Sequence, residues 1–292
     1  MDIVICLHIT DLPIIKRNIP LIKKNISGIN NLYIISDNRN FKYFSSSFKK
    51  KYDVCFIDEN QLIDGLTRER VKKLVVSQFG NTQKAGWYLQ QFLKLSFSLS
   101  LYAKDYYLVW DSDTIPVRPL NFFDDKGRTL FTIKEEYHKP YFDTMQKILG
   151  ISKTNEGSFI AEHMLFNVSI LKEMLCKIEN NQHLDGNTWW EKVLLATDPN
   201  EPIGFSEFET YGTYCEKFYK NLIAYRKLST LREGGKIYSF FLKTEEFENF
   251  GKEYDTISYE NSHYPPFPDN IKCHFYRFPI RILNYLRVKN II

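Results

Sequence analysis

Asp111 and Asp113 are the residues of this sequence whose types and spacing point most directly to chemistry. They follow residues 107–110, an aromatic and branched run that predicts a buried strand, and only Ser112 separates them. If the strand conformation continues, its alternation places both carboxylates on one face. Two such oxygen donors suit a hard divalent cation that keeps positions open for a substrate phosphate. A solvated turn after the strand is the alternative that the same residue types allow.

Apolar runs along the chain indicate the sheet that would position this pair. The predicted strands are residues 3–7, 32–35, 54–57, 130–133 and 162–167, and the predicted helices are residues 14–25, 61–79 and 169–179. Continuous apolar strands that alternate with helices are typical of a mostly parallel α/β sheet covered on both faces. Ligands of such sheets bind at the carboxyl ends of the strands, where the aspartate pair is expected. Neither GxGxxG nor GxxxxGK[ST] occurs, so the dinucleotide fingerprint and the P-loop are both excluded.

A helix predicted over residues 86–103 carries two stripes with helical spacing. The first stripe is apolar and is expected to face the core; it consists of Tyr88, Phe92, Leu95 and Leu99. The second stripe is mostly polar and consists of Trp87, Gln91, Lys94 and Ser98, with Gln90 beside it. It is either an ordinary solvated face, or Gln90, Gln91 and Lys94 border the pocket in front of the aspartate pair. In the second case Lys94 offers a point charge to phosphate.

The composition restricts the classes of protein that fit. The 292 residues suffice for one large α/β domain, and 43% hydrophobic residues argue against disorder. A net charge of +4 is too small to indicate a nucleic-acid-binding protein. Five scattered cysteines form no CxxC pair, and no apolar run approaches the roughly 20 residues of a membrane span. With an N-terminus unlike a signal peptide, these features predict reduced thiols and a cytoplasmic location.

Four segments in order resemble the GT-A glycosyltransferases. They are residues 86–95 (GWYLQQFLKL), 110–113 (WDSD), 162–167 (EHMLFN) and 205–214 (FSEFETYGTY), and the likeness is closer to a bacterial group associated with capsule and lipopolysaccharide synthesis. The resemblance implies a GT-A-like, Rossmann-like sheet flanked by helices, with an elaborated C-terminal half. It also implies a single domain over residues 1–292, in which residues 1–120 bind the nucleotide sugar and residues 121–292 form the acceptor side.

The same resemblance implies a metal site. Asp111 and Asp113 match the DxD motif, in which Mn²⁺ or Mg²⁺ holds the diphosphate of a nucleoside-diphosphate sugar, with UDP as the favoured nucleotide. A C-terminal histidine completes the metal shell in many GT-A enzymes, and His274 and His263 compete for that role here. Neither lies in the HxxGxxKPW context of the glycogenin-like group, so the third protein ligand is open.

Further site residues follow from the resemblance and from the chemistry of sugar transfer. The loops at residues 8–11, which include Asp11, and at residues 36–39 would face the base and ribose. Lys94 or Arg232 would add positive charge at the leaving diphosphate. An inverting enzyme also needs a carboxylate base at the acceptor hydroxyl, and Glu207 and Glu209 are the best sources. Ser206 and Glu209 have capping-box spacing, which favours Glu207 as the reactive member.

The predicted function is therefore metal-dependent transfer of a sugar to a glycan acceptor, either an oligosaccharide or a lipid-linked glycan. Two alternatives stay open: a sugar-nucleotide-binding module without catalysis, and a nucleotidyltransferase. The basic and apolar tail at residues 277–292 either lies on the inner face of an anionic membrane or docks its apolar face on the domain.

Overall fold

The computed structural model describes residues 1–153, 157–239 and 241–289. Its centre is a five-stranded sheet with the order β3-β2-β1-β4-β7. The strands are β1 (Asp2–Cys6), β2 (Leu32–Ser36), β3 (Val54–Asp58), β4 (Tyr106–Trp110) and β7 (His163–Asn167). The first four run parallel, and β7 pairs antiparallel with β4. The mostly parallel α/β sheet predicted from the apolar runs is confirmed.

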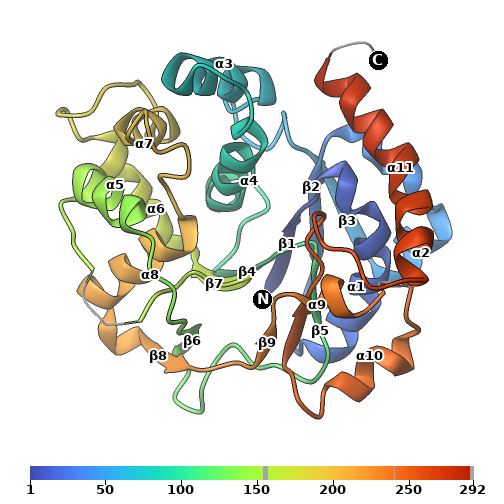
Figure 1. The fold of residues 1–292 in the computed structure, drawn as a ribbon. Helices are drawn as coiled ribbons and strands as arrows, with labels where there is room; N and C mark the ends of the chain where they lie inside the picture. The colour runs from blue at the N-terminus through green and yellow to red at the C-terminus, as the bar shows by residue number, and fades with distance from the viewer. Residues whose placement is uncertain (154–156, 240, 290–292) are drawn as a thin grey trace.

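Both faces of the sheet are covered, as continuous apolar strands require. One face packs against α1 (Leu12–Asn25), α2 (Ser46–Tyr52) and α11 (Asp269–Val288). The other packs against α3 (Arg68–Phe79), α4 (Ala85–Ser96), α5 (Lys139–Leu149), α6 (Val168–Glu179), α7 (Trp189–Ala196) and α8 (Glu207–Phe218). Within β1, Ile3 and Ile5 point to the face covered by α1, α2 and α11, and Val4 and Cys6 point to the face covered by the other helices. The alternation of side chains along the strand therefore contributes residues to a hydrophobic core on each face. Figure 1 shows the two groups of helices on opposite sides of the sheet.

Two small sheets complete the fold. One has the order β5-β10-β9 and joins β5 (Thr114–Pro116), β10 (Thr256–Ser258) and β9 (Thr230–Leu231), and the other pairs β6 (Thr129–Thr132) with β8 (Ile223–Arg226). The remaining helices are η1 (Ile9–Asp11), η2 (Asn38–Tyr43), η3 (Phe97–Leu99), η4 (Lys220–Leu222), α9 (Gly234–Ile237) and α10 (Thr244–Phe250). The strand predicted at residues 130–133 is thus present, but it lies outside the central sheet.

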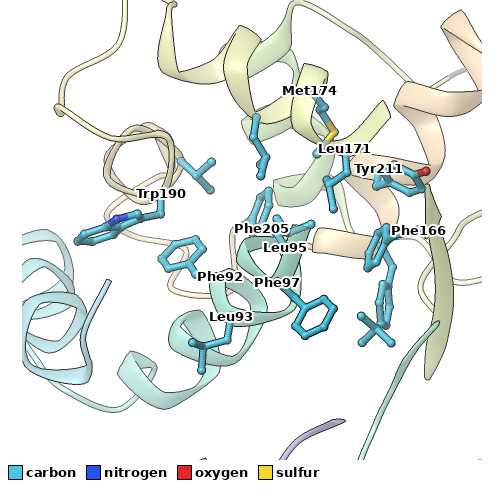
Figure 2. Packing of buried hydrophobic residues seen from close by; sticks show 14 of the residues in the cluster. Phe92, Leu93, Leu95, Phe97, Phe166, Leu171, Met174, Trp190, Phe205 and Tyr211 are labelled. Atoms are coloured by element: carbon cyan, nitrogen blue, oxygen red, sulfur yellow. The ribbon is translucent and has the colours of Figure 1, made fainter. Parts of the chain in front are cut away.

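Helix α4 is held by an aromatic core. The ring of Phe92 lies 6.0 Å from that of Trp190 in α7 and 6.3 Å from that of Phe205. Figure 2 shows these three side chains converging between α4 and the helices that follow β7. Because Phe92 is fully buried, the register of α4 is fixed by its apolar stripe, and the neighbouring stripe is positioned with it.

Two predicted helices have different limits in the structure. The helix predicted over residues 61–79 begins only at Arg68, because the Thr67 side chain accepts a hydrogen bond from the Arg70 N–H and caps the first turn. The helix predicted over residues 86–103 ends at Ser96 and continues as the short η3. Leu99, expected in the core, is therefore 41% exposed.

The described part of the chain contains no helix that is both long and apolar enough to cross a membrane. Cys6, Cys215 and Cys273 are buried, and Cys55 and Cys176 are exposed.

Candidate active site

The aspartate pair lies in a turn at the carboxyl end of β4. The strand ends at Trp110, and the Thr114 N–H donates a hydrogen bond to the Asp111 carbonyl oxygen at 3.2 Å. The condition for a shared strand face, an extended conformation through both aspartates, is therefore not met, and the alternative of a turn after the strand is what the structure has. The turn is only partly solvated, because Ser112 is buried and the Asp111 N–H donates to the Glu162 carbonyl oxygen at 3.0 Å, while the Asp111 side chain is 25% exposed.

Lys94 joins the first aspartate to helix α8. Its Nζ lies 2.7 Å from Asp111 Oδ1 and 2.6 Å from Glu207 Oε1. Burial alone favours the neutral amine, but the two carboxylates outweigh it and raise the pKa of Lys94. The interpretation of its stripe as a solvated face is wrong, since Gln91, Lys94 and Ser98 are all buried. Lys94 forms ion pairs with two carboxylates and is not open to solvent. It therefore fixes the orientation of Asp111.

Glu207 is the first residue of α8 and is held at both backbone and side chain. Ser206 caps the helix, and its side chain accepts a hydrogen bond from the Glu209 N–H at 3.2 Å. The Glu207 N–H donates to Gln91 Oε1 at 3.1 Å, and Glu207 Oε1 accepts from Lys94. Neither of these contacts involves Glu207 Oε2.

Glu209 has a different and structural set of partners. Its Oε2 accepts a hydrogen bond from the Phe159 N–H at 2.7 Å, and its Oε1 accepts from the Thr213 hydroxyl at 3.1 Å. The side chain therefore ties α8 to the segment before β7 and does not close the expected capping box with Ser206. Burial raises the pKa of Glu209. Both oxygens of Glu209 therefore accept hydrogen bonds within the protein.

Asp113 lies among carboxylates. Burial and the negative charges of Asp11, Asp111 and Glu260 raise its pKa well above the ordinary aspartate value. Among the described residues no lysine, arginine or histidine forms an ion pair with it. The neighbourhood of Asp113 thus carries negative charge that a bound cation would compensate.

Asp11 reaches the turn from η1, the short helix that follows β1. Its Oδ2 accepts a hydrogen bond from the Ser112 hydroxyl at 2.6 Å, and its Oδ1 accepts from the Asn261 side chain. The carboxyl ends of β1 and β4 meet here because the two strands are parallel neighbours. Asp37, which follows β2 and caps η2, pairs with Arg39 of η2 at 2.6 Å at the same edge of the sheet.

The oxygen donors fit a hard divalent cation, while the expected histidine does not join them. Asp111 and Asp113 supply carboxylates of the kind that Mg²⁺ and Mn²⁺ prefer. His274 is exposed on α11, where its ring stacks on Tyr264 with centroids 4.0 Å apart. Within the described ranges no three His, Cys, Asp or Glu side chains are grouped to hold a metal ion. His263 is buried, and its Nε2 lies 3.6 Å from Glu260.

Arg232 is connected to the aspartate turn indirectly, because it contacts Glu162, whose backbone carbonyl binds the Asp111 N–H. Its Nε lies 3.0 Å from Glu162 Oε1, and it also pairs with Glu136. The buried Glu162 side chain lies 3.4 Å from Lys134 as well. Gln90 is half-buried on α4, next to the Gln91 that contacts Glu207.

Glu162 and Glu260 act on the aspartate turn, although neither was predicted as a site residue; Glu162 entered the sequence analysis only as the first residue of the segment 162–167. Glu162 directly precedes β7, and β7 is antiparallel to β4, with Trp110 opposite His163. A strand that begins, rather than ends, at the ligand edge brings its preceding residue to the site, and the apolar pattern carries no information about strand direction. Glu260 follows β10 in a loop that no motif marks.

The matching family model is described as "Family of unknown function (DUF6492)", and it covers residues 22–246. The chain belongs to this family. No curated protein matches the DUF6492 chain.

Solved glycosyltransferase structures are similar to this DUF6492 protein in fold. Mouse xyloside xylosyltransferase 1, in its apo form, is 11% identical, with 90% of this chain and 98% of that chain covered and a TM-score of 0.43. The galactosyltransferase LgtC, in complex with donor and acceptor sugar analogues, is 11% identical, with 89% and 87% covered and a TM-score of 0.42. The bifunctional glycosyltransferase WbbM, in its apo form, is 13% identical, with 90% and 46% covered and a TM-score of 0.45.

Proposed function

We propose that this protein is a metal-dependent glycosyltransferase that moves a sugar from a nucleoside-diphosphate sugar to a glycan acceptor. The observation that carries the proposal is the acidic turn after β4, which holds Asp111 and Asp113 at the end of the strand and binds Asp11 through the Ser112 hydroxyl between them. The turn lies at the carboxyl edge of a parallel sheet, where ligands of such folds bind. The DxD resemblance supports the same reading of these carboxylates.

Asp111 and Asp113 would hold Mn²⁺ or Mg²⁺. When bound, such an ion neutralises charge on the leaving diphosphate, an effect worth several kcal/mol of barrier. Lys94 keeps Asp111 in one orientation through its 2.7 Å contact, and its buried position makes that orientation rigid. Asp11 holds the middle of the same turn through Ser112.

Glu207 is the proposed base for an inverting transfer. Its Oε2 would take the proton of the acceptor hydroxyl, whose oxygen then forms the new bond to the anomeric carbon. The bond from that carbon to the diphosphate breaks, and its electron pair leaves with the diphosphate. Lys94 donates to Oε1 and so fixes the plane of the carboxylate that must meet the hydroxyl.

The resemblance to capsule and lipopolysaccharide enzymes supports a bacterial surface polysaccharide as the acceptor and a uridine nucleotide in the donor. Such an acceptor is an oligosaccharide or a lipid-linked glycan, and the corresponding location is the cytoplasm, at the inner face of the membrane. Residues 1–120 then form the donor half and residues 121–292 the acceptor side of one domain.

The test is release of nucleoside diphosphate from a panel of nucleotide sugars, measured with Mn²⁺, with Mg²⁺ and with EDTA. The proposal expects release from at least one donor, dependent on the divalent ion and lost in Glu207→Gln when an acceptor is supplied. Donors that all remain intact under every condition would contradict it.

A further inference from the structure

Helix α11 docks on the domain through one side, where the half-buried Ile280 and Leu283 pack against the core, and leaves a separate apolar stripe exposed. Its buried side carries Cys273 and Arg277, and Arg277 Nη1 donates to the His263 carbonyl oxygen at 2.8 Å. Arg281 donates to the Asn261 carbonyl oxygen at 2.9 Å, and Arg287 to Asn40 Oδ1 at 2.7 Å. Three arginines thus bind the helix to residues 261–263 and to η2. The tail thus docks some apolar side chains on the domain, Ile280 and Leu283, as one of the two expectations had it, while other apolar side chains of the helix are exposed.

The opposite side of α11 is an exposed apolar stripe with helical spacing. Its members are Ile271, Phe275, Phe278, Ile282 and Tyr285, four and three residues apart in turn. Phe275 is 77% exposed and Phe278 is 64% exposed. Figure 1 shows α11 (red) at the outer edge of the molecule. Large aromatic side chains are uncommon on a solvated face unless they meet a partner.

The net positive charge of the chain comes from this helix and Lys289. The whole chain has 39 basic and 35 acidic residues; residues 269–289 hold five of the former and one of the latter. The remainder is therefore balanced at 34 of each, and the net charge of +4 belongs to α11 and Lys289. Lys272, Arg281 and Lys289 are exposed beside the stripe.

We propose that α11 is a membrane-binding helix that lays this apolar stripe into the interface of an anionic bilayer, with its flanking cations at the lipid head groups. Aromatic side chains favour the boundary between head groups and acyl chains, and basic residues near an anionic surface add attraction. Asn261 links the helix to the site, because its carbonyl accepts from Arg281 and its side chain donates to Asp11. The helix therefore attaches the protein beside the loop that holds the acidic turn.

A second copy of this chain is the competing occupant, and the stripe is a poor fit for it. Residues 271–285 cover about two heptads, while a stable coiled coil needs about three to four. Like charges also flank the stripe on both sides, so two copies of the helix would repel each other. An anionic lipid surface instead complements those cations. A lipid-linked acceptor as the reason for attachment rests on the proposed function, whereas the binding face does not.

The experiment is co-sedimentation of the full chain with phosphatidylglycerol-containing vesicles and with pure phosphatidylcholine vesicles. We expect binding to the anionic vesicles that weakens with salt and falls at least about tenfold in Phe275→Gln/Phe278→Gln, since each buried phenylalanine is worth about that factor. Leu101→Gln/Phe218→Gln removes two exposed apolar side chains elsewhere and is the matched control, with binding unchanged.

The charge variant Lys272→Gln/Lys289→Gln should weaken binding to anionic vesicles by about tenfold or more and leave any binding to phosphatidylcholine unaffected. Intact protein that stays in the supernatant with both vesicles overturns the proposal. So does a dimer in light scattering that Phe275→Gln/Phe278→Gln converts to monomer, because the stripe would then be a self-association face. Nucleotide release in solution is independent of these variants, so failure here and failure of the proposed function are told apart.

Discussion

Replacing Lys94 with methionine tests how the acidic turn is held. The change keeps the length of the side chain and removes its charge, so Glu207 loses its contact at 2.6 Å and Asp111 loses its contact at 2.7 Å. The Glu207 side chain is only 6% exposed, whereas that of Asp111 is 25% exposed and partly screened by water. The penalty therefore arises mainly from Glu207, a carboxylate left buried without a counter-charge.

Breaking a buried ion pair from one side costs about 3–5 kcal/mol, and because Asp111 is partly hydrated we expect about 3 kcal/mol for Lys94→Met. The double variant Lys94→Met/Glu207→Gln is the matched control. The amide of the glutamine at position 207 carries no charge and needs no counter-charge. The double variant should therefore be about 1–3 kcal/mol more stable than the sum of the two single effects predicts, and this difference is the coupling free energy.

The assay is urea unfolding of the wild type, both single variants and the double variant, followed by tryptophan fluorescence. The pKa of Lys94 is raised in the folded protein, so its contribution is present in full below the ordinary lysine pKa. It is lost only as the pH rises through the folded value, which makes measurements at about pH 7 representative. A loss below about 1 kcal/mol in Lys94→Met, or strictly additive effects in the double variant, would refute the reasoning.

Two further outcomes are expected. Glu207→Gln should lower turnover by about 10²–10⁴-fold and largely keep folding stability. Glu209→Gln should lower the folding stability by about 1–3 kcal/mol, because the hydrogen bond from the Phe159 N–H is weakened, and should change turnover little. Equal and small effects of the two variants on the rate would contradict the assignment of Glu207 as the base. Hydrogen bonds led by that from Lys177 lower the pKa of Glu173 from 4.5 to about 2, so its contribution is present above pH 4.5 and is lost as the pH falls toward 2. Acid titration of stability should be shallower across that window in Glu173→Gln, and identical curves for the variant and the wild type would contradict this.

Much of the fold could be predicted from the sequence because the parallel strands are apolar throughout. The predicted runs at residues 3–7, 32–35 and 54–57 are β1, β2 and β3, which lie side by side. Local patterning cannot reveal which strands share a sheet, so nothing in residues 130–133 indicated that β6 pairs with β8. The late start of α3 depended on a single cap, Thr67.

The candidate site was predictable where one motif holds the residues and not where the fold brings them together. Asp111 and Asp113 follow from spacing and strand ends. The bridge from Lys94 to Glu207 joins residues 113 positions apart, and the helical stripe of Lys94 was equally compatible with a solvated face. Glu162 reaches the turn only because β7 is antiparallel, a property that apolar patterning does not encode.

The most direct test of the central claim is calorimetric titration of UDP and of GDP into the protein, with Mn²⁺ and with EDTA. Asp125→Asn, an exposed aspartate in another loop, serves as the matched control for Asp113→Asn. The proposed site predicts nucleotide binding that requires Mn²⁺, is unchanged in Asp125→Asn and weakens at least about tenfold, or 1.4 kcal/mol, in Asp113→Asn. Binding that is equal in the wild type and Asp113→Asn, with and without EDTA, or no binding of either nucleotide, would contradict it.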